Sequence, residues 1–363
     1  MRGMGAIFVG SDIYRLPAFA PPHPLAIPRA MLVADLCVAL KWLDESYYVE
    51  SPMAASEALC RFHSPDYIAA LRRAEAEQDL PREVREATRI GADSNPIHQA
   101  VFRRPAISAG GALLAASRTA GGGTVFAPGV GNHHGRRDRA SGFCFVNDIA
   151  LGILRWQDLG LRRIAYLDLD AHHGDGVEEA FAGDPDVLTV SVHAAGAWPH
   201  SGGASRPAQG VWNFPLPNKT NDSEYARLIE ERVLPLIASH QPEAIFLLPG
   251  ADALADDPLG KLGLSNNAIW HAVRAVRPLA PRLVVGGGGG YNPFALARCW
   301  AGIWAILTGR PIPEILPDAA QEVLRGVNYF RAAGRNPPPH WLTTLRDAPN
   351  SGPIREEFLR MTA

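Results

Sequence analysis

Cysteine is scarce in this sequence, and long apolar runs are absent. The four cysteines, Cys37, Cys60, Cys144 and Cys299, are far apart and form no Cys-x-x-Cys pair. This spacing argues against both a disulfide framework and a thiolate zinc site. No stretch reaches the ~20 apolar residues that span a bilayer, and the N-terminal apolar run is too short for a signal peptide. We therefore expect a cytoplasmic protein with reduced thiols.

A strong excess of charge of either sign is also missing. The chain has 35 lysines and arginines against 37 aspartates and glutamates, a formal net charge of -2. No global basic field is present to drive non-specific binding of nucleic acid. We expect no nucleic-acid or membrane partner, and favour a protein or small-molecule substrate.

The length and apolar content indicate a globular α/β protein. The 363 residues, 47 % of them hydrophobic, can bury a large core in one large domain or in two smaller ones. Short apolar runs predict strands at 5–10, 123–129, 163–170, 187–193, 244–250 and 282–290. Helical patterns between them cover Met31–Trp42, Ile107–Thr119, Asp148–Leu159, Ser223–His240, Asn267–Val276 and Pro293–Leu307. This alternation predicts a mostly parallel central sheet with helices on both faces.

The Pro-rich, polar stretch from 335 to 363 is expected either to wrap the surface or to be loosely ordered. Elsewhere, nearly every motif that is rich in potentially reactive side chains lies at the end of a predicted strand. In parallel sheets, ligands bind outside the carboxyl ends of the strands.

The stretch "DLDAHHGDG", residues 168–176, places three acids and two histidines directly after an apolar strand. Asp168, Asp170 and His172 would share one face if the strand geometry persisted to residue 172. Clustered carboxylates repel one another unless a cation lies between them, and carboxylate oxygen with imidazole nitrogen suits zinc or a related transition metal. The alternative is that these aspartates merely cap the next helix.

A second strand leads into "LLPGADALADDPLG", residues 247–260. Asp252 would complete a set of three ligands with Asp170 and His172, and would leave a fourth position for water, as in catalytic zinc sites. Taken alone, Asp252 would be read as a turn residue.

The stretch "GVGNHHGRRDRASGFCFVND", residues 129–148, carries the tandem pair His133 and His134. Two imidazoles in a glycine-flanked loop suit the general base and acid of a metal-assisted hydrolysis. Each would need a carboxylate to fix its tautomer, and Asp168 and Asp175 are available. The alternative is that the two histidines are surface residues without a catalytic role.

The stretch "RLVVGGGGGYNP", residues 282–293, ends a strand with five glycines and then Tyr291. Glycines allow close approach of the backbone to a ligand, and a phenol held there can donate a hydrogen bond to a developing oxyanion. The run lacks the spacing of a phosphate-binding loop.

These motifs, taken in order with "DLDAHHGDGVEEAF" and "VSVH" between residues 91 and 292, resemble the zinc-dependent histone deacetylase family, which includes bacterial acetoin-utilisation and acetylpolyamine amidohydrolase proteins. The resemblance implies the arginase-like deacetylase fold, with residues 1–363 as a single catalytic α/β domain. It places zinc on Asp170, His172 and Asp252, a set that also accepts iron(II). His133 and His134 become the tandem histidines, partnered by Asp168 and Asp175, while Tyr291 polarises the acyl carbonyl.

The resemblance also assigns a substrate tunnel and a structural potassium site. Gly142 and Phe143 match the tunnel wall, and Trp198 stands where the family usually has the facing Phe. Asp93 resembles the rim aspartate that grips the substrate backbone. The potassium ligands that the resemblance implies are of two kinds. They are the side chains of Asp168 and Ser191, and the backbone carbonyls of Asp170, His172 and Val192.

One departure from the family bears on substrate. The polyamine-specific members carry a glutamate where this chain has Leu259, which favours acyl-lysine in a protein or peptide, cleaved to a carboxylate and free lysine. Alternatives are an acetylpolyamine or other small-molecule amidohydrolase, and a non-catalytic module that binds acyl-lysine. A binuclear manganese enzyme would need additional Asp and His ligands near the second strand end, where Asp256 and Asp257 accompany Asp252 but the D-x-D spacing is absent.

Overall fold

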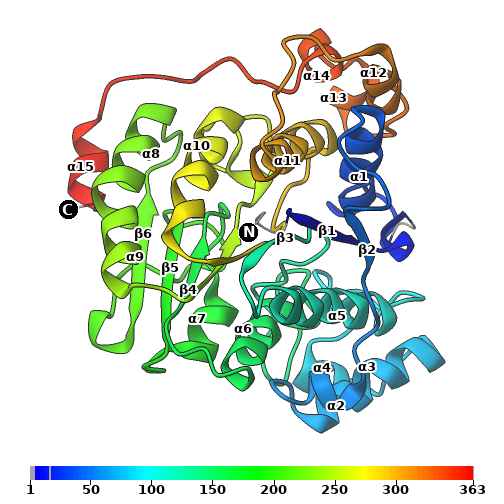
Figure 1. Cartoon of the computed structure of the whole chain (residues 1–363). Helices are drawn as coiled ribbons and strands as arrows, with labels where there is room; N and C mark the ends of the chain where they lie inside the picture. The colour runs from blue at the N-terminus through cyan, green and yellow to red at the C-terminus, as the bar shows by residue number, and fades with distance from the viewer. Residues whose placement is uncertain (1–4, 16–17, 363) are drawn as a thin grey trace.

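Eight strands form one central sheet in which every pair of neighbouring strands is parallel, and this sheet organises one α/β domain. The computed structural model describes residues 5–15 and 18–362 (Figure 1). The strand order is β2-β1-β3-β8-β7-β4-β5-β6. The strands are β1 (Ile7–Gly10), β2 (Tyr48–Glu50), β3 (Gly123–Phe126), β4 (Ile164–Asp168), β5 (Val187–Ala194), β6 (Val211–Leu216), β7 (Ala244–Leu248) and β8 (Arg282–Val285).

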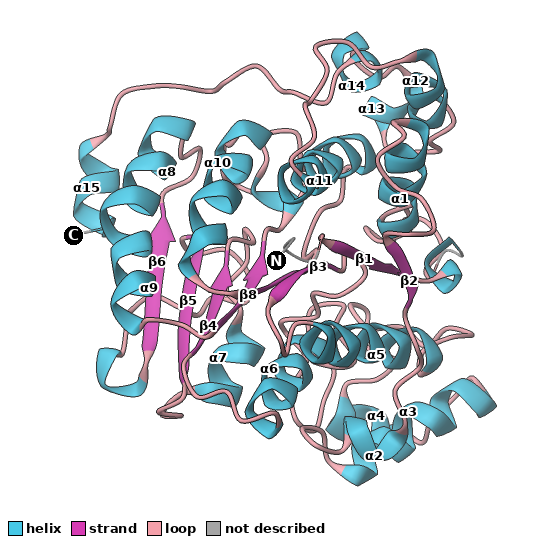
Figure 2. Cartoon of the chain, in the orientation of Figure 1, coloured by secondary structure: helices cyan, strands magenta, loops and turns pink. Residues whose placement is uncertain are grey.

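Helices cover both faces of the sheet, as Figure 2 shows. One face packs against α1 (Ala30–Ala39), α8 (Asp222–Leu228), α9 (Leu234–His240), α10 (Asn266–Val276) and α11 (Pro293–Thr308). The other packs against α5 (Arg103–Arg118), α6 (Asp148–Asp158) and α7 (Asp175–Phe181). A third apolar cluster joins α5 to α2 (Ser56–Leu59) and α3 (Pro65–Glu77), with α4 (Arg82–Thr88) beside them.

The sequence explains where the elements beside the site begin and end. All residues of β4 and β7 are buried, as expected for parallel strands covered on both faces. Asn147 caps α6 by accepting the Ala150 amide hydrogen. Asn292 caps α11 in the same way, with Pro293 at its first position. The loop that carries the tandem histidines and the loop that carries Tyr291 therefore each end at a fixed helix start.

Two strands and one helix differ from the sequence prediction. The edge strands β2 and β6 were not predicted, because β2 is short and only partly buried and β6 contains Pro215, which favours an edge position. The single helix expected over Ser223–His240 is divided by a π-helical turn, Ile229–Val233. Pro235 follows this turn, and its missing N–H removes one bond of the regular helical ladder.

The C-terminal segment runs over the surface from α12 (Asp318–Arg325), α13 (Ala332–Arg335) and α14 (Pro339–Thr343) to α15 (Glu356–Thr362), as the red trace in Figure 1 shows. The helix α15 packs against β6. Arg355 pairs with Glu224 at 2.7 Å, and the Asn350 amide donates to Asp222. Among the described residues, no helix is both long and apolar enough to cross a membrane, and all four cysteines are free thiols.

The sheet order places the motifs together. β3, β8, β7 and β4 are adjacent in the sheet, and the four loops that follow their carboxyl ends carry the tandem histidines, Tyr291, Asp252 and the pair Asp170 and His172, respectively. The fold thus brings residues more than a hundred positions apart to one edge of the sheet.

Candidate active site

Asp170, His172 and Asp252 form a compact cluster of metal-ligand type. Their ligand atoms all lie within 4.8 Å of one another, and among the residues that the structure describes no other group of three or more such side chains could hold a metal ion. Asp170 and His172 lie in the loop after β4, and Asp252 in a 3-10 turn, Ala251–Ala253, after β7. His172 Nδ1 is 2.8 Å from Asp252 Oδ2 and 3.3 Å from Asp170 Oδ1. Both carboxylates are fully buried.

The charge of this cluster fits a divalent cation. Burial and the neighbouring Asp170 carboxylate raise the pKa of Asp252 to about 7. Burial alone would lower the pKa of His172, but hydrogen bonds with Asp170 and Asp252 raise it to about 11. Two buried carboxylates therefore depend on one imidazole proton for compensation. A zinc ion supplies that charge, and two carboxylates with one imidazole are a suitable ligand set that leaves a coordination position open.

The glycine run before Tyr291 is needed because the backbone passes directly against the ligand carboxylates. A Cβ atom at Gly289 would overlap Asp252 Oδ2, and one at Gly250 would overlap Asp170 Oδ2. Gly288 has φ +95°, a conformation that favours glycine. The Gly289 amide also donates a hydrogen bond to Asp170 Oδ2. The run thus shapes the metal-binding cluster.

The tandem histidines are buried, and each is bound to its own carboxylate. His133 Nδ1 is 2.8 Å from Asp168 Oδ2, and His134 Nδ1 is 2.7 Å from Asp175 Oδ1. The ring centroids are 3.8 Å apart, and His133 Nε2 lies 3.9 Å from Asp170 Oδ1. The pair therefore lies beside the metal-binding cluster, with its Nδ1 atoms held by the carboxylates.

The two imidazoles differ in proton affinity. Burial alone would lower the pKa of His133, but the charges of Asp168 and Asp170 raise it to about 9. Burial, together with the charge of His133, lowers the pKa of His134 to about 3. Burial opposes ionisation of Asp175, yet its contacts with His134 and Arg136 lower its pKa. One of the two histidines is therefore poised to accept a proton and the other to carry one.

The expected common face of Asp168, Asp170 and His172 depended on a strand that continues to residue 172, and this condition is not met. β4 ends at Asp168, and the chain then leaves the strand geometry on which the expectation depended. The Asp168 carboxylate instead accepts hydrogen bonds from His133, from the Tyr166 hydroxyl at 2.6 Å and from the Asp170 amide at 3.0 Å.

Tyr291 is the remaining candidate catalytic residue and lies close to His172. Its backbone amide donates to Asp257 Oδ2 at 2.6 Å, and its ring centroid lies 6.5 Å from that of His172. Burial, with the nearby Asp252 and Asp170 carboxylates, holds the pKa of the phenol well above its usual value. The hydroxyl therefore keeps its hydrogen at neutral pH and can donate it to an oxygen at the site.

Two aromatic residues, Trp198 and Phe143, lie beside the candidate active site. The ring centroid of Trp198 is 4.6 Å from that of His134 and 6.4 Å from that of His172, and the side chain is 41 % exposed. A Cβ at Gly142 would overlap the Trp198 ring, and Phe143 contacts Tyr291 with a centroid distance of 6.0 Å. The residues proposed for the tunnel wall therefore meet at the site.

Asp93 and Leu259 lie in loops outside this cluster. Asp93 is exposed in the turn 92–95. Leu259 is partly buried in the loop after Asp252, where its amide donates to Asp257 Oδ1 at 2.9 Å.

Several positioning residues were not identified from the sequence. Asp148 accepts the amide hydrogens of Gly131 and Asn132 at 3.1 and 2.9 Å, and so anchors the loop before the tandem histidines. The sequence pattern identifies Asp148 only as the first residue of a predicted helix. Asp257, weighed earlier only as a further metal ligand, instead holds the backbone of Tyr291.

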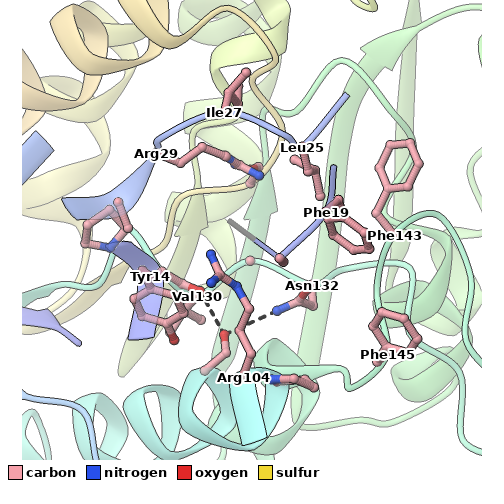
Figure 3. Close-up of a pocket in the computed structure, with 18 of the residues that line it drawn as sticks. Tyr14, Phe19, Leu25, Ile27, Arg29, Arg104, Val130, Asn132, Phe143 and Phe145 are labelled. Carbon is pink, nitrogen blue, oxygen red and sulfur yellow. Dashed lines mark hydrogen bonds between the residues drawn. The ribbon is translucent and has the colours of Figure 1, made fainter. Parts of the chain in front are cut away.

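A cavity of about 120 Å³ adjoins the cluster through Gly288, Asn132 and Phe143. Figure 3 shows Arg29 and Arg104 projecting into it from opposite walls. Arg29 donates to the Gly288 carbonyl, and its ring contact with Trp300 spans 5.5 Å. Arg29 thus binds the backbone of the glycine run, a role that no local sequence pattern indicated.

A model of the histone deacetylase domain matches residues 23–307. The chain belongs to the histone deacetylase family. It is 33 % identical over 329 residues to the acetoin utilization protein AcuC of Bacillus subtilis, covering 86 % of this chain and 85 % of that protein. It is 33 % identical to histone deacetylase 8 of Xenopus tropicalis, covering 80 % of each.

Solved structures of histone deacetylase homologues share the whole fold. One, a homologue complexed with SAHA, superposes with a TM-score of 0.93 at 35 % identity, and the match covers 99 % of this chain and 98 % of that one. A homologue from Aquifex aeolicus gives 0.92 at 34 % identity with the same coverage. The family consists of zinc-dependent hydrolases, and this histone deacetylase family member is a hydrolase.

Proposed function

We propose that this histone deacetylase family protein hydrolyses the amide bond of acyl-lysine in proteins or peptides, and releases a carboxylate and free lysine. One observation carries the proposal. The ring of His172, a member of the metal-binding cluster, lies 6.4 Å from the ring of His134, one of the tandem histidines, and 6.5 Å from the Tyr291 ring, between centroids. A bound amide would thus meet a metal, a base and an oxyanion donor at one point.

Asp170, His172 and Asp252 would hold zinc, with iron(II) as the alternative metal. When bound, the metal supplies Lewis acidity that polarises the amide carbonyl and acidifies a water molecule. His133 or His134 accepts the proton of that water at Nε2, because Nδ1 of each ring is occupied by Asp168 or Asp175.

The Tyr291 hydroxyl donates a hydrogen bond to the carbonyl oxygen as negative charge develops on it. A protonated histidine of the pair then gives its proton to the departing lysine amine. The buried carboxylates Asp168 and Asp175 stabilise the imidazolium formed in between. In total, water attacks the carbonyl carbon and the carbon–nitrogen bond breaks. The hydroxyl group of the water stays on the carboxylate product, and its proton passes through the histidine to the lysine amine.

The surroundings of the cluster favour lysine over a polyamine. Phe143 and Trp198 provide apolar walls for the methylene stem, and Leu259 supplies no negative charge for a second amine of the substrate. Asp93, exposed at a loop, is proposed to accept hydrogen bonds from the substrate backbone.

We further propose a structural potassium ion beside the cluster. The sheet register pairs Asp168 with Ser191, which places the carboxylate, the Ser191 hydroxyl and the backbone at Val192 on neighbouring strands. The carbonyls of Asp170 and His172 would complete the set. Oxygen ligands of this kind suit a hard monovalent cation better than zinc.

A substrate panel tests the proposal. The zinc-loaded protein is assayed on acetyl-, propionyl- and longer acyl-lysine peptides and on N-acetylputrescine. We expect kcat/KM for an acyl-lysine peptide to exceed that for the polyamine at least tenfold. A preference for N-acetylputrescine would contradict the assignment of Leu259, and one bound zinc without any turnover would support a module that only binds acyl-lysine.

A further inference from the structure

A second pocket lies near the C-terminal ends of α10 and α11 and is lined by four arginines, of which Arg346 comes from the segment after α14. Its volume is about 410 Å³, within the range of roughly 300–1,000 Å³ that is usual for small-molecule sites. Apolar residues of α11 and the segment after it form part of the wall. We call this site the arginine pocket; its lining comprises Arg274, Arg277, Arg310 and Arg346 with Ala305, Ile306, Gly309, Pro311 and Ile312.

The arginine pocket carries positive charge without matching carboxylates. Within residues 5–15 and 18–362, none of its four guanidinium groups forms an ion pair with an acid. Asp347, next to Arg346 in the sequence, is paired with Arg298 at 2.6 Å instead. Asp44 is near Arg310, but its carboxylate is hydrogen-bonded by Ser46.

Two further observations accompany the lack of ion pairs. The Nε atom of Arg310 is buried and has no hydrogen-bond partner. Burial, and the charge of Arg346, lower the pKa of Arg274. Like charges are thus held together at a cost that an anion would relieve.

Three of the side chains each donate one hydrogen bond, which leaves most of their N–H donors available. Arg346 lies over the Trp270 ring at 5.4 Å and donates to Asn267 Oδ1 at 2.7 Å. Arg310 lies over the Tyr47 ring at 5.5 Å and donates to the Lys41 carbonyl. Arg277 donates to the Ile306 carbonyl at 3.0 Å. Since a guanidinium has five N–H donors, several remain for a ligand, and the groups are already oriented.

Stabilisation of helix ends explains only part of this arrangement. Arg277 and Arg310 bind carbonyls at the ends of α11 and α1, where a cation is favourable. Arg346 binds a side chain at the start of α10, where the helix dipole opposes a positive charge, and Arg274 makes no ion pair. Stabilisation of a helix end therefore does not account for Arg346, whereas Arg274 lies in the last turn of α10, where a cation is favourable, without an acidic partner among the described residues.

We propose that the arginine pocket binds a small anion that carries two or more linked phosphate groups. Planar guanidinium forks match phosphate oxygens in pairs, and four of them suit more charge than one carboxylate provides. Ile306, Pro311 and Ile312 would contact any apolar part of the ligand. The pocket is distinct from the metal-binding cluster, because α11 begins two residues after Tyr291 and spans 16 residues, about 24 Å.

Isothermal titration calorimetry on the full chain tests this site, with ADP and inorganic tripolyphosphate as probes. We expect saturable one-to-one binding that weakens as sodium chloride is raised from 50 to 300 mM. Equal affinities would indicate recognition of the phosphates alone, and tighter binding of ADP would indicate that the apolar wall also contacts the nucleoside; both support the site.

The decisive variant is Arg274→Gln/Arg346→Gln, which spares Arg277 and Arg310, the two arginines that donate to carbonyls at helix ends. We expect at least tenfold weaker binding with an unchanged Tm, whereas the matched control Arg118→Gln, an exposed arginine of α5, binds as the wild type does. Should the double variant unfold, Arg274→Gln alone serves in its place. Absence of binding, binding unaffected in the double variant, or binding lost in Asp252→Asn would overturn the proposal, the last by locating the phosphates at the metal-binding cluster.

Discussion

His134 Nδ1 lies 2.7 Å from Asp175 Oδ1 in the buried site, and Arg136 contacts the other oxygen of the same carboxylate. Because its pKa is lowered, Asp175 is ionised and can only accept hydrogen bonds. The Nδ1 atom of His134 therefore carries the hydrogen, and Nε2 keeps the lone pair with which it can accept a proton.

Replacing the carboxylate tests this relationship. Asp175→Asn keeps the size of the side chain, but its amide can present a hydrogen to Nδ1 and so stabilise the wrong tautomer. We expect kcat/KM on an acetyl-lysine peptide to fall about 10- to 100-fold, with zinc content unchanged. Asp138→Asn, an exposed acid of the same loop, is the matched control. Equal rates for the two variants would mean that Asp175 does not act through His134.

Metal stoichiometry tests the cluster of Asp170, His172 and Asp252. We expect one zinc per chain by elemental analysis after dialysis, and loss of that zinc in Asp252→Asn. Asp256→Asn is the control, since Asp256 points away to the Trp341 indole at 2.8 Å. Chelation of the wild type should lower Tm, because a ligand bound only to the folded state stabilises it. Two tightly bound ions per chain would favour the binuclear alternative.

Because of His63, the free energy of unfolding is expected to depend on pH in the acid range. Its Nε2 accepts the Asn147 amide hydrogen at 3.0 Å, and burial lowers its pKa to about 4, against about 6.5 in the unfolded chain. Between these values the unfolded state binds the extra proton, so the free energy of unfolding falls as the pH is lowered from about 6.5 to 4. From pH 7 to pH 5 the loss due to His63 is about 2 kcal/mol.

Urea unfolding at the two pH values measures this effect. His63→Gln should be less stable than the wild type at pH 7 and should show a pH dependence smaller by about 2 kcal/mol. His200→Gln, which replaces an exposed histidine, should leave the dependence as it is. An unchanged dependence in His63→Gln would show that this imidazole is not kept neutral by the fold.

The sequence was sufficient to place the reactive side chains at strand ends, because buried parallel strands are visible as continuous apolar runs. The structure brings Asp170, His172, Asp252 and Tyr291 together as that reasoning requires. The assignment of the family and of the α/β fold is confirmed by the comparisons.

What the sequence could not show depends on contacts between distant segments. Asp148 and Asp257 act on backbone amides of other loops, and Arg29 reaches the Gly288 carbonyl from the start of α1. Local patterns mark such residues only as caps or surface charges. The same holds for the arginine pocket, whose four members come from three separate segments.

The most direct test of the proposed hydrolysis is the rate of zinc-loaded Tyr291→Phe on an acetyl-lysine peptide. The variant removes one hydroxyl and leaves the amide of residue 291 free to bind Asp257. We predict a loss of about two to three orders of magnitude in kcat, as for removal of one oxyanion donor, with one zinc still bound. A loss below threefold would contradict the role of Tyr291 in the reaction.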